Sequence, residues 1–175
     1  MSHQNFFNVG INITPAVQKG TTIGLQYTPT PLAYMGLNML MEFSTASAFL
    51  NVANPSPRKN ITVMAHLDTG ASLTSIDHSI AAYLGLVSTG QQQISTASGF
   101  SVVNNYAADI GFIGSQLKGI QNLQISSCQL PHFNLQNCLA NPNLPMNFGV
   151  LIGRDLMSRW NIIWNGPTST VFISD

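Results

Sequence analysis

The sequence predicts an all-β domain with one or two short helices, and three observations support this. Apolar and polar residues alternate from 37 to 44, and a second strand-like run covers 61–67. Residues 91–113 repeat the strand chemistry on both sides of a small-residue tip at 97–99. Helical spacing appears in short stretches only, so strands form most of the predicted core.

The first two strands are separated by a Pro-containing loop at 54–60, and we expect them to pair as a long hairpin. Apolar residues at helical spacing then predict a short helix over 76–84. Thr74 or Ser75 is the expected N-cap, and Gly85 is placed to end the helix.

The second half of the chain continues the strand pattern. After the hairpin of 91–113, a further strand is expected within 117–127, followed by a Pro-rich loop over 128–147. An apolar strand at 148–152 leads into a short helix. A final pair of strands is expected around Asn165-Gly166.

Composition limits the class of function. A length of 175 residues favours one domain, and 45% apolar residues are enough for a buried core. Six Lys and Arg balance six Asp and Glu, so no basic field exists to collect phosphates and no nucleic-acid partner is expected. The same low charge opposes self-association only weakly, which permits a homo-oligomer.

The chain shows no targeting or membrane segment. Its most apolar stretch, 32–53, contains Asn38 and Glu42, which are costly in hydrocarbon, so we expect no membrane span. The first residues lack the cationic start and apolar run of a secretory signal, which predicts a cytoplasmic protein. Cys128 and Cys138 are interpreted as free thiols, although a disulfide between them stays open.

One segment carries residues suited to chemistry. A strand candidate runs directly into Asp68-Thr69-Gly70, which places a carboxylate at a tight turn. Because glycine has no Cβ, other groups can come close to the backbone of this turn. The tripeptide alone is also ordinary turn chemistry. Nucleophile-elbow, Walker and zinc-ligand patterns are missing from the sequence, so neither a metal nor a cofactor is expected.

The segment resembles the active-site loop of the retropepsins, the retroviral-type aspartic proteases. The residues that match this loop are Asp68, Thr69, Gly70, Ala71 and Ser72. The run Val150 to Met157, with Gly153, Arg154 and Asp155, is similar to the second signature of the family. The family places its flap hairpin over the substrate at Thr96, Ala97, Ser98, Gly99 and Phe100.

The resemblance implies a retropepsin-like closed β-barrel, which is half of an acid protease, in a two-fold homodimer. It implies an aspartic endopeptidase in which the two Asp68 carboxylates activate a water against an extended peptide. The protease domain is expected at 37–175. Residues 1–36 lie outside the resemblance and are interpreted as an N-terminal arm or a prosegment.

The chain departs from the family pattern at two places. Ser72 stands where many retroviral members carry an acid that pairs with the arginine of the second signature, so Arg154 is expected to pair with Asp77 or Asp155. The flap tip holds one glycine, Gly99. These departures keep an alternative open, a catalytically weak or inactive retropepsin-like dimerisation or peptide-binding module.

Two other acids are candidates for a second catalytic group within one chain. They are Asp109 and Asp175. Neither precedes Thr-Gly or Ser-Gly, which disfavours both.

Overall fold

The chain is described by a computed structural model, which covers residues 4–8, 17–18, 21–22, 37–47, 58–96, 99–144, 146–165 and 170–175. The strands are β1 (Gln4–Asn8), β2 (Val17–Gln18), β3 (Thr21–Thr22), β4 (Asn38–Thr45), β5 (Asn60–Leu67), β6 (Ser75–Asp77), β7 (Ser88–Thr96), β8 (Gly99–Phe112), β9 (Ile120–Cys128), β10 (Phe148–Ile152), β11 (Asn161–Asn165) and β12 (Thr170–Ser174). The helices are α2 (His78–Leu84), α3 (Leu135–Ala140) and α4 (Arg154–Met157). No helix in these ranges has the length and apolar character to cross a membrane.

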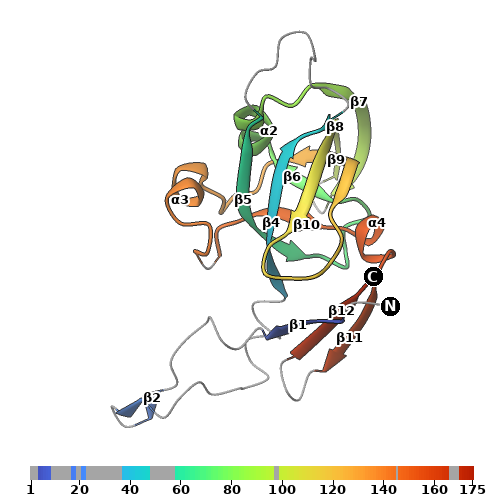
Figure 1. Ribbon diagram of the computed structural model, residues 1–175. Coiled ribbons are helices and arrows are strands. Elements are labelled where there is room, and N and C mark those ends of the chain that lie inside the picture. The colour runs from blue at the N-terminus through green and yellow to red at the C-terminus, as the bar shows by residue number, and fades with distance from the viewer. Residues whose placement is uncertain are drawn as a thin grey trace.

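Six strands close into a barrel (Figure 1). They lie in the order β4-β5-β10-β6-β9-β8, and β4 pairs a second time with β8 to complete the circle. Strand β7 extends the sheet outward from β8 as an antiparallel hairpin. This arrangement confirms the predicted all-β closed barrel and the predicted pairing of the first two strands.

The barrel core follows from the alternation along the strands. Every second residue of β4 and β5 points inward, and the largest fully buried side chains include Phe43, Met41 and Val63. Strand β10 contributes Val150 and Ile152, both 0% exposed. Because one face of each strand is committed to this core, the register of the strands is set by burial.

Strand β10 determines where the two motifs, the Asp68 loop and the Gly153-Arg154-Asp155 segment, meet. It lies between β5 and β6, parallel to β5 and antiparallel to β6. Parallel neighbours end at the same edge of a sheet, so the residue after β5 and the residue after β10 lie close together. The backbone N–H of Asp68 donates to the carbonyl of Ile152 at 3.0 Å, which joins the two strand ends directly.

Two local predictions were wrong. Helix α2 begins after Asp77, whose side chain accepts the N–H of Ser79, instead of at Thr74 or Ser75, because residues 75–77 form β6 inside the barrel. Gly85 ends the helix at φ 64° as predicted. The stretch 128–147, predicted as a loop, contains α3, which Asn134 caps through the N–H of Asn137.

The C-terminal strands form a separate three-stranded sheet beside the barrel (Figure 1). Strands β11 and β12 pair antiparallel as predicted, while the glycine of the expected turn, Gly166, lies outside the described residues. Strand β1, which belongs to the segment interpreted as an arm or prosegment, pairs antiparallel with β12. The sheet order β1-β12-β11 leaves β1 and β11 as its edges.

Both cysteines are free thiols. Cys138 is buried, and its Sγ donates to the carbonyl of Thr62 at 3.3 Å. Burial, together with the nearby charge of Asp77, raises the pKa of Cys128 to about 11, so this thiol is protonated and weakly nucleophilic at neutral pH.

Gly153 tests how tightly the two motifs are packed. A Cβ at this position would lie 2.4 Å from the carbonyl carbon of Leu73 and 2.7 Å from the amide nitrogen of Thr74, both rigid backbone atoms. We expect Gly153→Ala to lower the free energy of unfolding by about 1–3 kcal/mol, as overpacking does. Urea denaturation with a constant m-value measures this change.

The matched control for this prediction is Gly111→Ala in β8, where a Cβ would meet no atom closer than 4.0 Å. This variant should stay within about 0.5 kcal/mol of the original chain. Equal destabilisation of both variants would show that the close backbone contact at Gly153 is not the reason why Gly153→Ala lowers the free energy of unfolding.

Candidate active site

The carboxylate of Asp68 is oriented by the turn that follows β5. Its Oδ1 accepts hydrogen bonds from the backbone N–H groups of Gly70 at 2.8 Å and Ala71 at 3.3 Å. A Cβ at Gly70 would stand 3.1 Å from the same oxygen, so glycine keeps this approach open. One carboxylate oxygen is therefore held by the backbone, and the side chain stays partly exposed.

The loop after Asp68 is attached to the end of β10 through Thr74, which is fully buried. Its Oγ1 donates to Oδ1 of Asp155 at 2.8 Å and accepts the backbone N–H of Gly153 at 3.1 Å. Oδ1 of Asp155 also accepts the backbone N–H of Thr74 at 2.9 Å and that of Leu156 at 2.8 Å. Asp155 thus holds the loop against α4, and three of these hydrogen bonds, all made by Thr74, join the two motifs.

Arg154 clamps the same loop from outside. Its Nη1 donates to the carbonyls of Thr69 at 2.7 Å and Gly70 at 3.2 Å, and its Nη2 donates to Oγ of Ser72 at 2.9 Å. The planar guanidinium suits this fork of three acceptors, which a lysine could not match.

The expectation that Arg154 pairs with Asp77 or Asp155 is wrong. Asp77 is occupied as the cap of α2 and as acceptor of the Leu130 N–H at 2.9 Å, and Asp155 is occupied by Thr74. The guanidinium of Arg154 uses neutral acceptors in place of the acid that many retroviral members carry at the position of Ser72. The sequence signal was the hydroxyl of Ser72 itself, which can accept where a carboxylate is absent.

His66 lies two residues before Asp68 on β5. Its Nδ1 is 2.9 Å from Oδ1 of Asn38, and its ring stacks on Phe148 with 5.1 Å between centroids. Burial lowers the pKa of His66 below its ordinary value of 6.5, while the negative charge of Asp68 opposes the shift. Since the unfolded chain binds this proton more readily, folding stability falls as the pH drops from 6.5 through the lowered pKa.

The predicted flap is a hairpin of β7 and β8. The pairing runs to its end, where the backbone of Thr96 is opposite Gly99. Near this end Phe100 and Val102 are 76% and 67% exposed, so apolar side chains are held in solvent. The tip residues Ala97 and Ser98 lie outside the described residues.

The two alternative acids have structural partners. Asp109 accepts from Oγ of Ser47 at 2.5 Å and the N–H of Asn122 at 2.8 Å, and it pairs with Arg58. Burial raises the pKa of Asp109, but these hydrogen bonds and the guanidinium outweigh it, so the pKa lies below its ordinary value. Oδ2 of Asp175 accepts the backbone N–H of Lys118 at 3.1 Å.

Residues 58–155 match the family model of the aspartyl proteases, which is more than half of the chain and includes both motifs. The chain belongs to the aspartyl protease family. This finding confirms the assignment that the Asp68 loop and the Gly153-Arg154-Asp155 segment had indicated. Among curated proteins no match is found.

Solved structures that resemble this family member include a retropepsin-like aspartic protease from Rickettsia conorii. It is 16% identical, with a TM-score of 0.39, and the match covers 79% of this chain and 93% of that one. A foamy viral protease-reverse transcriptase in complex with an RNA/DNA hybrid is 14% identical, with a TM-score of 0.38 over 70% of this chain. This chain spans 12% of the length of that viral protein.

The coupling between His66 and Asp68 can be measured without a substrate. Replacing Asp68 by Asn removes the negative charge that holds the histidine pKa up, so we expect Asp68→Asn to lower the pKa of His66 further. A pH titration of the imidazole proton signals by NMR reads this shift. The signals of His132, which is exposed, are the internal control. An unchanged or higher pKa of His66 in the variant would contradict the coupling.

Proposed function

We propose that the protein is an aspartic endopeptidase that acts as a homodimer, with Asp68 of each chain in one shared site. The observation that carries the proposal is the Asp68 loop, whose carboxylate is oriented by Gly70 and Ala71 and whose backbone is clamped by Arg154. Membership of the aspartyl protease family supports it. The full sequence contains one Asp-Thr-Gly, which supplies half of a two-carboxylate site.

Two Asp68 side chains within hydrogen-bond reach would share one proton, because two adjacent negative charges are costly. The ionised carboxylate takes a proton from a water as that water attacks the peptide carbonyl. The protonated carboxyl donates to the carbonyl oxygen and stabilises its developing charge. The first carboxyl then gives the proton that it took from the water to the leaving amine, and the peptide bond breaks without a covalent enzyme intermediate.

The hairpin of β7 and β8 is the proposed cover of the cleft. The residues predicted to form the flap are Thr96, Ala97, Ser98, Gly99 and Phe100. An extended peptide would lie between the hairpin and the Asp68 loop as an added strand. The exposed Phe100 and Val102 would then be covered by the substrate or by the partner, which favours hydrophobic side chains in the peptide.

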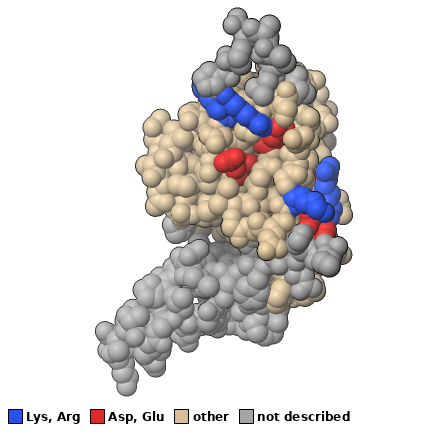
Figure 2. Space-filling model, viewed as in Figure 1, with Lys and Arg blue, Asp and Glu red and all other residues tan. Residues whose placement is uncertain are grey.

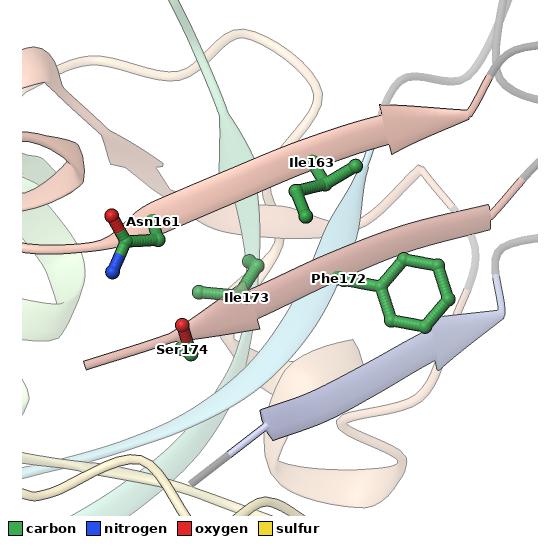
Figure 3. A pocket seen from close by; sticks show the side chains of 5 residues that line it. All are labelled: Asn161, Ile163, Phe172, Ile173 and Ser174. Carbon is green, nitrogen blue, oxygen red and sulfur yellow. The ribbon is translucent and has the colours of Figure 1, made fainter. Parts of the chain in front are cut away.

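The terminal sheet offers the surface for dimerisation. Ile163 of β11 is opposite Phe172 of β12, and both border a cavity of about 240 Å³ (Figure 3). Ile163 is 64% exposed, and β11 pairs with no further strand among the described residues. An edge strand with an exposed apolar residue can pair with a second copy of the chain, and the low net charge opposes this association only weakly.

Cleavage of a mixed peptide library tests the activity. Digests from about pH 3 to 7, read by mass spectrometry, should show cuts by the original protein that are strongest on the acid side, where the dyad holds one proton. Asp68→Asn should abolish every cut, because it removes the base. Asp175→Asn, which also removes one carboxylate, should cleave normally.

Intact peptides at every pH, with folded dimeric protein, would overturn the endopeptidase and favour the peptide-binding module. Cuts that persist in Asp68→Asn would instead show that another group is the base.

Dimerisation is tested at Ile163. We expect Ile163→Glu to shift the protein from dimer to monomer in light scattering, because a carboxylate would be buried in the apolar interface. Cleavage should fall in parallel, by more than tenfold at dilute protein. Val87→Glu is the matched control, since Val87 is 63% exposed and lies outside the terminal sheet. A monomeric Ile163→Glu that cleaves normally would contradict the shared site.

A further inference from the structure

A second pocket lies beside the Asp68 loop, with a volume of about 260 Å³. Leu73 of that loop forms one wall, and Gln92 of β7 and Asn105 of β8 form another. Asp155 of α4, Arg159 just after α4, and residues 123–126 of β9 line the rest. The pocket is therefore bounded by the same loop and the same hairpin that frame the proposed peptide cleft.

Arg159 is set apart from the other cations of the described residues. Arg58 pairs with Asp109, Lys118 lies 4.0 Å from Asp175, and Lys59 donates to the carbonyl of Tyr83 at 3.1 Å. Arg154 is used by the active-site loop. Among these described side chains, Arg159 alone has a charged head without an acceptor.

Charge is scarce on this protein, so a charge without a partner is informative. The chain has six Lys and Arg in all, and most of the described surface seen in Figure 2 is uncharged. Arg159 is exposed at the pocket, where a bound group can reach its five N–H donors.

Gln92 provides a second donor in the same pocket. Its Nε2 is buried and has no hydrogen-bond partner within the described structure. A buried donor left unpaired carries a desolvation cost, which a ligand acceptor would remove. The pocket thus holds two unused donors, one charged and one neutral.

Asp155 also lines the pocket and would repel an anion, but its Oδ1 is already engaged. Three hydrogen bonds, two from Thr74 and one from Leu156, stabilise that oxygen. Oδ1 of Asp155 is therefore engaged by the loop, whereas the guanidinium of Arg159 has no acceptor among the described residues.

We propose that this pocket is a substrate subsite that binds an acidic side chain of the peptide, with Arg159 and Gln92 as its donors. The inference rests on the proposed peptidase function, because it assumes an extended peptide between the loop and the hairpin. The carboxylate would accept from the Arg159 guanidinium and from Nε2 of Gln92. The enzyme would then prefer an Asp or Glu at one position several residues from the cut.

The test separates binding from cleavage. Peptides with Glu, Gln, Leu or Lys at each position are bound to Asp68→Asn, which is expected not to cut them, and followed by fluorescence anisotropy. At one position we expect Glu to bind about fivefold more tightly than Gln, with the difference shrinking at high salt. Arg159→Gln in the same background should remove this preference, and Arg159→Glu should replace it with a preference for Lys.

Lys118→Gln is the matched control, since it removes one positive charge outside the pocket and should keep the preference for Glu. Gln92→Leu should weaken binding of the Glu peptide and leave that of the Leu peptide unchanged. Equal binding of Glu and Gln peptides, or a Glu preference that survives Arg159→Gln, would overturn the subsite.

A failed subsite and a failed peptidase are distinguishable. Cuts by the original protein without any acidic preference would reject the subsite and keep the endopeptidase. Arg159-dependent binding of acidic peptides without cuts would keep the subsite and reject the endopeptidase.

Discussion

The hydroxyl of Thr74 is the contact on which the site depends. It accepts the N–H of Gly153 and donates to Asp155, so it joins the loop after β5 to the end of β10. Gly153 permits this approach because it has no Cβ, and a Cβ at this position would clash with the backbone of Leu73. Without that contact the Asp68 loop would lose its buried attachment and keep the exposed clamp of Arg154, and an oriented carboxylate needs a rigid support.

Barrel closure and the site are parts of the same arrangement. Strand β10 is inserted between β5 and β6, and the parallel pairing with β5 brings both motifs to one edge of the sheet. Residues distant by more than 80 positions therefore meet in hydrogen bonds of 2.7–3.2 Å, such as those from Arg154 to Thr69, Gly70 and Ser72. The loop is stabilised by the fold, and the fold is closed by the strand that carries the second motif.

Although charge is scarce, several of the ionised groups make contacts that hold the fold together. Asp109 and Arg58 link the β4–β5 and β8–β9 regions, and Arg154 holds the loop. Neutral hydroxyls and amides make most remaining polar contacts, such as the 2.6 Å hydrogen bond between Ser75 and Ser126. A surface of this kind depends little on salt and opposes pairing of two copies only weakly.

The sequence by itself determined most strands of the barrel, the end of α2 at Gly85 and the two motifs, because alternation and turn chemistry are local properties. Only the tertiary structure decided the partners of Arg154, which went to backbone carbonyls and Ser72 once Asp77 and Asp155 were occupied. It also decided that residues 75–77 form β6, because β10 and β9 offered hydrogen bonds on both sides. Such choices depend on contacts between distant segments, which no local pattern contains.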